Sequence, residues 1–314
     1  MSATSLERLE RLANSDPTIA PLAPLLAITL RAATSPRWGE GIPALETDLS
    51  TGLRQPLLHE RTLGVDLALL RSLVVQLAQA AASSPAGKAL GEVVEARVLD
   101  PAHLLHAGIT MSTERLDEMA ADYGLDAGFL ATLSQLASQP LLQASGKAAT
   151  AFVARRTWDA GPCPVCAAWP IWGELRGLER QPWLRCGRCA VGWEFSHQRC
   201  VYCDNTDHRT LGYLASQSDR ESRRAATCDQ CGGYLKQIAT VTPPTSADLS
   251  LEDLATLELD LAALEQGYAR PSEPAFRLEV EIEPLPGQTC STDHTESAPA
   301  TALGRWPGRL PWRS

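Results

Sequence analysis

The chain has 314 residues, of which 44% are hydrophobic and 21% are charged. This composition is typical of a soluble globular protein with about two domains, and it excludes a fibrous or disordered chain. The formal net charge of -9 lies between Gly232 and Pro299, where 12 acidic residues outnumber 3 basic ones. The acidic balance argues against a protein that binds nucleic acid through its phosphates.

The amino terminus does not read as a secretory signal, because MSATSLERLERLANSDP is charged and lacks an apolar core. The longest apolar run, residues 19–30, contains two prolines and is shorter than the ~20 residues that span a bilayer. We therefore expect a cytoplasmic protein without membrane insertion. In that reducing compartment, paired cysteines are more often metal ligands or redox groups than structural disulfides.

Residues 1–157 contain no cysteine and repeat Leu and Ala every three or four positions. This spacing is typical of amphipathic helices that pack on one another, and it predicts an all-helical domain. Ser112 is the expected N-cap of one helix, and Gly124 is its expected left-handed terminator. The tetrapeptide QPLL, at 55–58 and 139–142, places its proline where a helix can start. The predicted helices cover residues 5–13, 19–33, 42–53, 62–82, 86–98, 112–123, 127–137 and 141–157.

The composition changes at Trp158, where the helical pattern ends and Gly and Pro become more frequent. Five of the eight tryptophans lie between Trp158 and Trp193. Large rings of this kind replace an aliphatic core in small metal-stapled units. Short alternating stretches such as GWEF, RTLGYL and GYLKQIATV predict β-hairpins.

After the prolines at 243 and 244 a helix is predicted, with Asp248 or Ser250 as its cap. The fold class that follows is a multidomain α+β protein. An all-α domain at 1–157 precedes two small zinc-ribbon-like β modules, at 158–197 and 198–244. A C-terminal helix within 245–286 packs on the rest, and 287–314 is predicted to form a flexible tail.

Eight of the nine cysteines form four C-x-x-C pairs. This spacing lets both sulfurs of a tight turn, a knuckle, point to one metal, and two knuckles complete a tetrahedral site. Pairing the knuckles in order leaves 19 residues between Cys166 and Cys186 and 24 between Cys203 and Cys228. We favour this order because each loop then contains its own hairpin; pairing of the first knuckle with the third is the alternative. The predicted metal ligands are Cys163, Cys166, Cys186, Cys189, Cys200, Cys203, Cys228 and Cys231.

Four-sulfur sites admit zinc or iron, and most of them only hold a fold. Thioredoxin-like redox chemistry is disfavoured, since no pair lies in a βαβ unit. His197 and His208 are interpreted as surface or packing residues, and Cys290 as a free thiol. Because the sequence lacks a phosphate loop, a nucleophile elbow and an H-E-x-x-H motif, no enzyme activity is predicted.

The region from about 158 to 272 resembles the FdhE family, accessory proteins of formate dehydrogenase biogenesis. The stretches that carry the resemblance are GPCPVCAAWP (161–170), LRCGRCAVGWEF (184–195), CVYCDNTDHRTLGYL (200–214), CDQCGGYLK (228–236) and DLATLELDLAALEQGYAR (253–270). The helical first half fits the family more loosely.

The resemblance implies a helical domain followed by two rubredoxin-like modules, each with one iron at its four cysteines; zinc is the alternative. It also implies a cytoplasmic protein that binds the catalytic subunit of a respiratory formate dehydrogenase. This subunit would need the protein for assembly or activation before twin-arginine export. Electron transfer through an iron–sulfur centre to the cofactors of that enzyme is the alternative function.

One feature departs from the rubredoxin pattern, which places Gly after the second cysteine of each knuckle. Here that position holds Ala167, Ala190, Asp204 and, only in the last knuckle, Gly232. Three knuckles are therefore expected to be strained or differently shaped. Tyr234 and Lys236 follow the last knuckle and are predicted to lie in a hairpin strand, with an exposed contact surface as the alternative.

Overall fold

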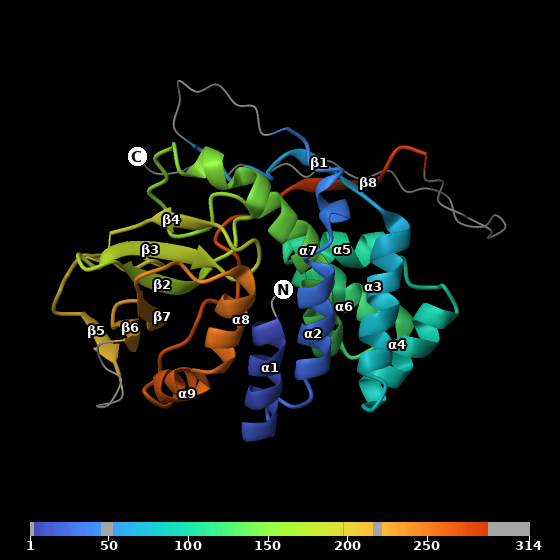
Figure 1. Ribbon diagram of the computed structural model, residues 1–314, viewed down its shortest axis with the longest axis horizontal. Helices are drawn as coiled ribbons and strands as arrows, with labels where there is room; N and C mark the ends of the chain where they lie inside the picture. The colour runs from blue at the N-terminus through green and yellow to red at the C-terminus, as the bar shows by residue number, and fades with distance from the viewer. Residues whose placement is uncertain (1–2, 45–52, 197, 216–221, 288–314) are drawn as a thin grey trace.

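The computed structural model describes residues 3–44, 53–196, 198–215 and 222–287 (Figure 1). A helical half lies beside a mixed half, in which a twisted sheet is backed by two short helices. The helices of the first half are α1 Ala3–Ser15, α2 Ala23–Ala32, α3 Leu67–Ala80, α4 Pro85–Glu95, α5 Pro101–Thr110, α6 Thr113–Tyr123 and α7 Ala127–Val153, with a short 3-10 turn at Pro36–Gly39.

Helix α7 is the centre of the helical half, since α2, α3, α5 and α6 all pack against it. The sequence predicts two helices here, 127–137 and 141–157, with Pro140 at a position where a helix can start. A proline inside a helix removes one backbone hydrogen bond. Pro140 instead lies buried inside one continuous helix. The neighbouring helices hold α7 together across this missing bond, so tertiary packing overrides the local signal.

Other helix boundaries follow their caps. Ser112 accepts from the backbone N of Arg115, and Gly124 ends α6 with φ 64°, as predicted. Asp100 caps α5, whose first residue is Pro101; this helix was missed although both signals are present in the sequence. The helix predicted at 42–53 lies largely outside the described residues, which omit 45–52.

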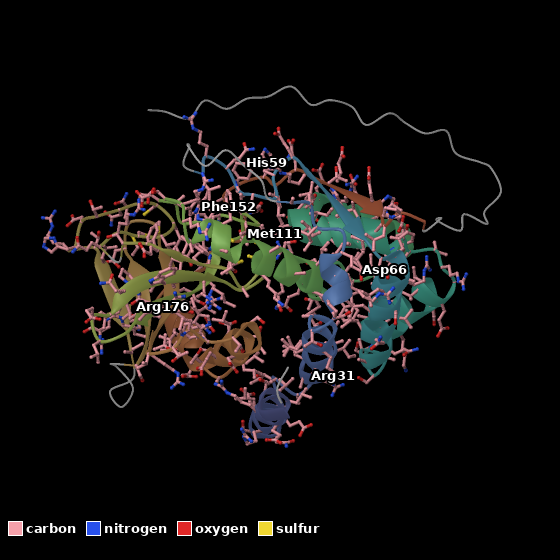
Figure 2. The ribbon with its side chains drawn as sticks, turned by 45° about the horizontal axis from the view of Figure 1, so that its top comes forward. Arg31, His59, Asp66, Met111, Phe152 and Arg176 are labelled. Atoms are coloured by element: carbon pink, nitrogen blue, oxygen red, sulfur yellow. The ribbon has the colours of Figure 1, made fainter. Side chains whose placement is uncertain are left out.

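The helix predicted at 62–82 begins with a strand, β1 Arg61–Val65, and becomes helical only after Asp66. Asp66 (Figure 2) accepts from the backbone N of Ala68 and Leu69. Strand β1 pairs in parallel with β8 Val280–Pro284, more than 200 residues later. The sequence could not reveal this pairing, because it depends on a distant segment.

A six-stranded sheet forms the mixed half, in the order β4-β3-β2-β7-β6-β5. Its strands are β2 Pro170–Arg176, β3 Gln181–Cys186, β4 Gly192–Glu194, β5 Leu211–Leu214, β6 Arg223–Cys228 and β7 Gly233–Thr240. Each four-cysteine unit contributes three strands, and the parallel pair β2–β7 joins them. The two units therefore share one continuous sheet.

Two helices, α8 Ser246–Leu254 and α9 Leu257–Glu265, follow the sheet in the chain, and α9 packs against β5, β6 and β7 (Figure 1). The cap of α8 is Thr245, not Asp248 or Ser250. Thr245 and Asp248 form a reciprocal capping box, in which Asp248 serves at the third helical position. No helix in the described part of the chain is long and apolar enough to cross a membrane.

The main core runs from the helical half into the first four-cysteine unit. The backbone N atoms of Leu57 and Leu58 donate to the carbonyls of Pro164 and Val165 in the first knuckle, at 2.8 and 3.1 Å. Leu58 and Val165 are both fully buried. The first unit is thus built into the helical half rather than attached to its surface.

Candidate metal centres

The eight paired cysteines form two clusters, one in each half of the sheet. The first contains Cys163, Cys166, Cys186 and Cys189, and the second contains Cys200, Cys203, Cys228 and Cys231. The sulfur atoms in each cluster all lie within 4.8 Å of one another. Neighbouring knuckles therefore meet in sequence order, and the interleaved arrangement is not observed.

The sulfur separations of the second cluster match a tetrahedral metal site, and those of the first cluster are slightly shorter. A metal–sulfur bond of about 2.3 Å places two sulfurs about 3.8 Å apart. In the second cluster the Cys200–Cys231 and Cys203–Cys228 sulfur pairs are separated by 3.7 and 3.8 Å. The corresponding pairs of the first cluster are separated by 3.4 Å. Either zinc or iron suits four thiolates at these distances.

The four knuckles share one backbone shape. The residue after each second cysteine has a positive φ: 63° at Ala167, 61° at Ala190, 56° at Asp204 and 68° at Gly232. Its backbone N donates to the carbonyl of the first cysteine in its knuckle, at 2.9 to 3.1 Å. The expectation of differently shaped knuckles is therefore wrong, while strain remains, since the left-handed region costs a non-glycine residue about 1 kcal/mol.

Donors aimed at the sulfurs favour their charged form. The backbone N atoms of Val165, Arg188 and Tyr202 each lie 3.4 Å from the first sulfur of their knuckle. Asn205 adds a side-chain donor, with Nδ2 at 3.5 Å from the Cys228 sulfur. Sequence reasoning missed Asn205; its position two residues after the knuckle was the available signal.

The two clusters differ in access to solvent. All four cysteines of the first are buried, with at most 1% of their surface exposed, whereas Cys203 is half-buried and Cys231 is exposed. Burial raises the pKa of Cys163 and Cys189. Burial also acts to raise the pKa of Cys228, but hydrogen bonds from Asn205 and from nearby backbone amides outweigh it and bring that pKa to about 7.

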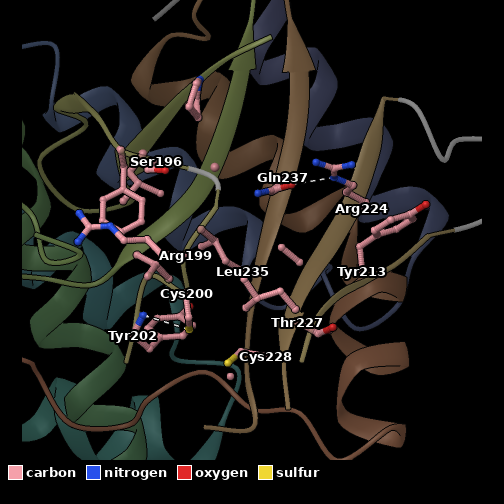
Figure 3. Close-up of a pocket in the computed structure, with 18 of the residues that line it drawn as sticks. Ser196, Arg199, Cys200, Tyr202, Tyr213, Arg224, Thr227, Cys228, Leu235 and Gln237 are labelled. Carbon is pink, nitrogen blue, oxygen red and sulfur yellow. Dashed lines mark hydrogen bonds between the residues drawn. The ribbon is translucent and has the colours of Figure 1, made fainter. Parts of the chain in front are cut away.

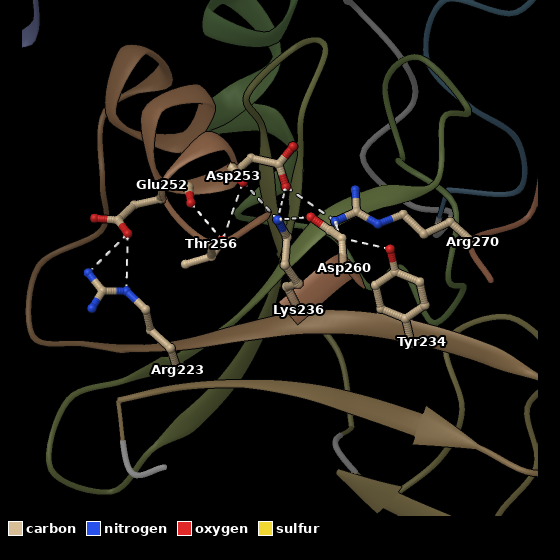
Figure 4. Close-up of polar contacts among 8 residues, drawn as sticks. All are labelled: Arg223, Tyr234, Lys236, Glu252, Asp253, Thr256, Asp260 and Arg270. Carbon is tan, nitrogen blue, oxygen red and sulfur yellow. Dashed lines mark hydrogen bonds and ion pairs between the residues drawn. The ribbon is translucent and has the colours of Figure 1, made fainter. Parts of the chain in front are cut away.

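A partly buried ionic cluster, centred on the fully buried Lys236, ties α8 and α9 to the strand that follows the last knuckle (Figure 4). The Nζ of Lys236 lies 2.7 Å from Asp253 and 2.6 Å from Asp260, and it sits over the Trp172 ring. Arg270 contacts both carboxylates, which raise its pKa although burial acts in the opposite direction. The Tyr234 hydroxyl donates to Asp260 at 2.7 Å.

Tyr234 and Lys236 lie in β7, as predicted. The alternative interpretation, an exposed contact surface, is wrong, because Tyr234 is 4% exposed and Lys236 is 0% exposed. His208 is exposed and belongs to neither cluster. His197 and Cys290 lie outside the described residues, as does the predicted tail from residue 288.

The sequence of this region matches a family of known proteins. The family model of the FdhE C-terminal domain matches residues 198–276, which hold the second cluster, α8 and α9. In sequence, this part of the chain is similar to FdhE proteins. The family match thus spans the exposed cluster and the buried Lys236 network, and it leaves the first cluster outside.

Individual FdhE relatives match parts of the chain. A protein FdhE homolog of Stutzerimonas stutzeri is 37% identical over 119 residues, 37% of this chain and 38% of that protein. A protein FdhE homolog of Enterobacter sp. is 31% identical over 180 residues, 52% of this chain and 55% of that protein. The chain therefore spans about two fifths to just over half of the length of these curated relatives.

A solved structure shares the fold. The crystal structure of the FdhE protein from Pseudomonas aeruginosa superposes with a TM-score of 0.56. The two chains are 24% identical, and the superposition covers 86% of this chain and 93% of that chain. The likeness extends beyond the C-terminal domain to the helical half.

Proposed function

We propose that the chain is a cytoplasmic accessory protein that binds the catalytic subunit of a respiratory formate dehydrogenase. In this proposal it serves assembly or activation of that subunit before twin-arginine export and has no catalytic activity of its own. The single observation that carries the proposal is the match of residues 198–276 to the FdhE C-terminal domain.

Each four-cysteine cluster is proposed to hold one iron ion, with zinc as the alternative. The donor set and the sulfur separations suit either metal, and a bound iron would add the capacity for one-electron redox change. The cysteines supply four thiolates, and the knuckle amides offset part of their charge. Metal analysis and an absorption spectrum of protein purified without oxygen test this step; a colourless protein loaded with zinc would overturn the assignment of iron.

The difference in burial suggests a division of roles. The first cluster lies inside the core with the helices, where a metal would fix the two halves to each other. The second cluster reaches the surface through Cys203 and Cys231. We infer that the first metal stabilises the fold and that the second lies near the surface that meets the partner.

Co-purification with a tagged formate dehydrogenase catalytic subunit tests the function. The wild-type chain is expected to be retained, and Cys231→Ser, which removes an exposed ligand of the second cluster, is expected to reduce retention. Asp207→Asn serves as a control on the same module, because the Asp207 carboxylate pairs with the exposed Arg209 and the substitution keeps the size of the side chain. Failure of the wild type to bind would refute the function, and full binding by Cys231→Ser would refute only the role of the second cluster.

Electron transfer is the second candidate function, and the exposure of Cys231 favours it, since electrons pass efficiently only over short distances between a centre and its partner. A red protein that bleaches with dithionite and recovers its colour in air would support this function. Electron transfer from the reduced protein to the catalytic subunit should then be faster than reoxidation of the reduced protein by air. Absence of a reversible colour change would exclude it.

A further inference from the structure

The sheet has two unlike faces. Tyr234 and Lys236 of β7 point to the face that α8 and α9 cover, where Tyr234 packs with Leu259 and Ala263. The neighbouring positions Leu235 and Gln237 point to the opposite face. On that face lies a groove of about 210 Å³, shown in Figure 3, that extends across both four-cysteine units. One end of the groove reaches Cys200 and Cys228 of the second cluster.

Small residues create the hollow of this groove. Gly173 of β2 pairs with Gln237, and Ala226 of β6 pairs with Leu235, so small residues lie beside larger ones across the centre of the face. A Cβ atom added at Gly173 would lie 3.1 Å from the Gln237 side chain and 3.5 Å from Leu235. The floor of the groove is therefore closely packed at Gly173, and the open volume of about 210 Å³ above it can admit a side chain from another molecule.

Arg224 lies at the rim of the hollow. Its Nε donates to Gln237 Oε1 at 2.7 Å, and its guanidinium lies 5.2 Å from the centre of the Tyr213 ring. Within the described residues, no carboxylate forms an ion pair with Arg224. Burial and the nearby Arg180 lower its pKa, since both disfavour its positive charge.

The other charged groups of the groove are already compensated. Glu174 is fully buried and pairs with Arg176 and Arg185. Arg199 pairs with Asp159 and Asp204 and stacks on a phenylalanine ring. Arg224 is thus the cation of this groove that lacks a carboxylate among the described residues, and a negatively charged ligand group would complement it. Arginine and aromatic side chains beside an apolar hollow are typical of the central residues of protein interfaces.

We propose that this groove is the docking site for an extended segment of a partner protein, which places an Asp or Glu side chain on Arg224 and an apolar side chain over Leu235. The groove crosses five strands, from β3 to β5. Four inter-strand spacings of about 4.8 Å give a length of about 19 Å, which matches about six residues of extended chain. This inference rests on the proposed function, with the formate dehydrogenase catalytic subunit as the partner.

Binding of the full, metal-loaded chain to the purified catalytic subunit tests the inference. Two variants change the groove: Arg224→Glu reverses its charge, and Ala226→Phe fills its hollow. Arg209→Glu is the matched control, since Arg209 is 80% exposed at its side chain and lies outside the groove. Both groove variants should weaken binding at least tenfold, and the control should change it less than twofold. Equal metal content and circular dichroism spectra show that the variants are folded.

The possible outcomes distinguish the proposed docking site from the proposed function on which it rests. Wild-type binding that both groove variants retain would overturn the docking site and leave the proposed function intact. Equal weakening by Arg209→Glu would also overturn it, since general surface charge would then explain the effect. A change of oligomeric state in Arg224→Glu, measured by light scattering, would identify a second copy of the chain as the occupant instead. No binding by the wild type would refute the function and the docking site together.

Discussion

The Lys236 ammonium, which has no exposed surface, lies 2.6 Å from a carboxylate oxygen of Asp260. This contact links β7, directly after the last knuckle, to α9. A second link comes from the backbone N of Ala269, which donates to the carbonyl of Gly232 at 2.8 Å. The segment after α9 thus touches the knuckle itself, and the second cluster depends on the helices behind the sheet.

The contact between Asp260 and the buried Lys236 should contribute more to the free energy of unfolding than an exposed ion pair does. We expect Asp260→Asn to lower the free energy of unfolding by about 3 kcal/mol, because it leaves Lys236 and Arg270 with less compensating charge. Asp207→Asn, whose partner Arg209 is exposed, should lower it by less than about 1 kcal/mol. Urea denaturation of the metal-loaded proteins measures both, and equal effects would show that the buried network adds little.

Glycine-to-alanine substitutions should have opposite effects on stability at a knuckle, where φ is positive, and inside a helix. Gly232 has φ 68°, and a Cβ added there would meet only the Gly267 carbonyl at an ordinary contact distance of 4.0 Å, so Gly232→Ala should lower the free energy of unfolding by about 1 kcal/mol through backbone strain. Gly91 lies inside α4 with nothing near it, so Gly91→Ala should raise it by up to about 1 kcal/mol. Thermal unfolding checks the signs, and stabilisation by both substitutions would contradict the strain.

The two metals should leave the protein at different rates. Cys231 and Cys203 offer a chelator access to the second cluster, while the first is enclosed by the core. Native mass spectrometry during treatment with a chelator should therefore pass through a species that retains one metal. Iodoacetamide should label Cys203 and Cys231 in that species before Cys163. Simultaneous loss of both metals would contradict the difference in access.

His106 should make stability depend on pH. Burial and Arg115 lower its pKa, and its Nε2 lies 3.1 Å from the Val280 carbonyl while its Nδ1 lies 3.1 Å from Arg115. A neutral ring satisfies both contacts, by donating from Nε2 and accepting at Nδ1. The unfolded chain takes up the proton first, near pH 6.5, so this contribution is complete above that pH and declines as the pH falls below it.

Replacing the ring should remove this slope. His106→Gln should flatten the dependence of unfolding free energy on pH between about 6.5 and 5, whereas His208→Gln, at an exposed site, should leave it unchanged. Urea titrations at a series of pH values measure both. A wild-type protein that gains stability on acidification in this range would show the opposite sign and refute the assignment.

Much of the candidate site could be predicted from the sequence because the signals are local. A C-x-x-C turn builds its own geometry, and the order of the knuckles follows from the loops between them. The helical caps at Ser112 and Gly124 are equally local. These features need no knowledge of the rest of the chain.

The missed features depend on contacts between distant segments. Strand β1 forms because residues 280–284 pair with it, and α7 continues through Pro140 because other helices pack around it. The sequence predicts Lys236 as a strand residue, but its burial depends on Asp253 and Asp260, which approach it from α8 and α9. Neither partner is marked in the sequence as anything other than a helical acidic residue.

The parallel pairing of β2 with β7 limits how the chain can be divided. A fragment confined to the matched residues 198–276 would lack β2, and the edge of β7 that β2 covers would become free. An uncovered edge in the middle of a former sheet is a template for self-association between copies. A fragment that contains only the second cluster should therefore aggregate. The cluster is best studied in a chain that retains β2.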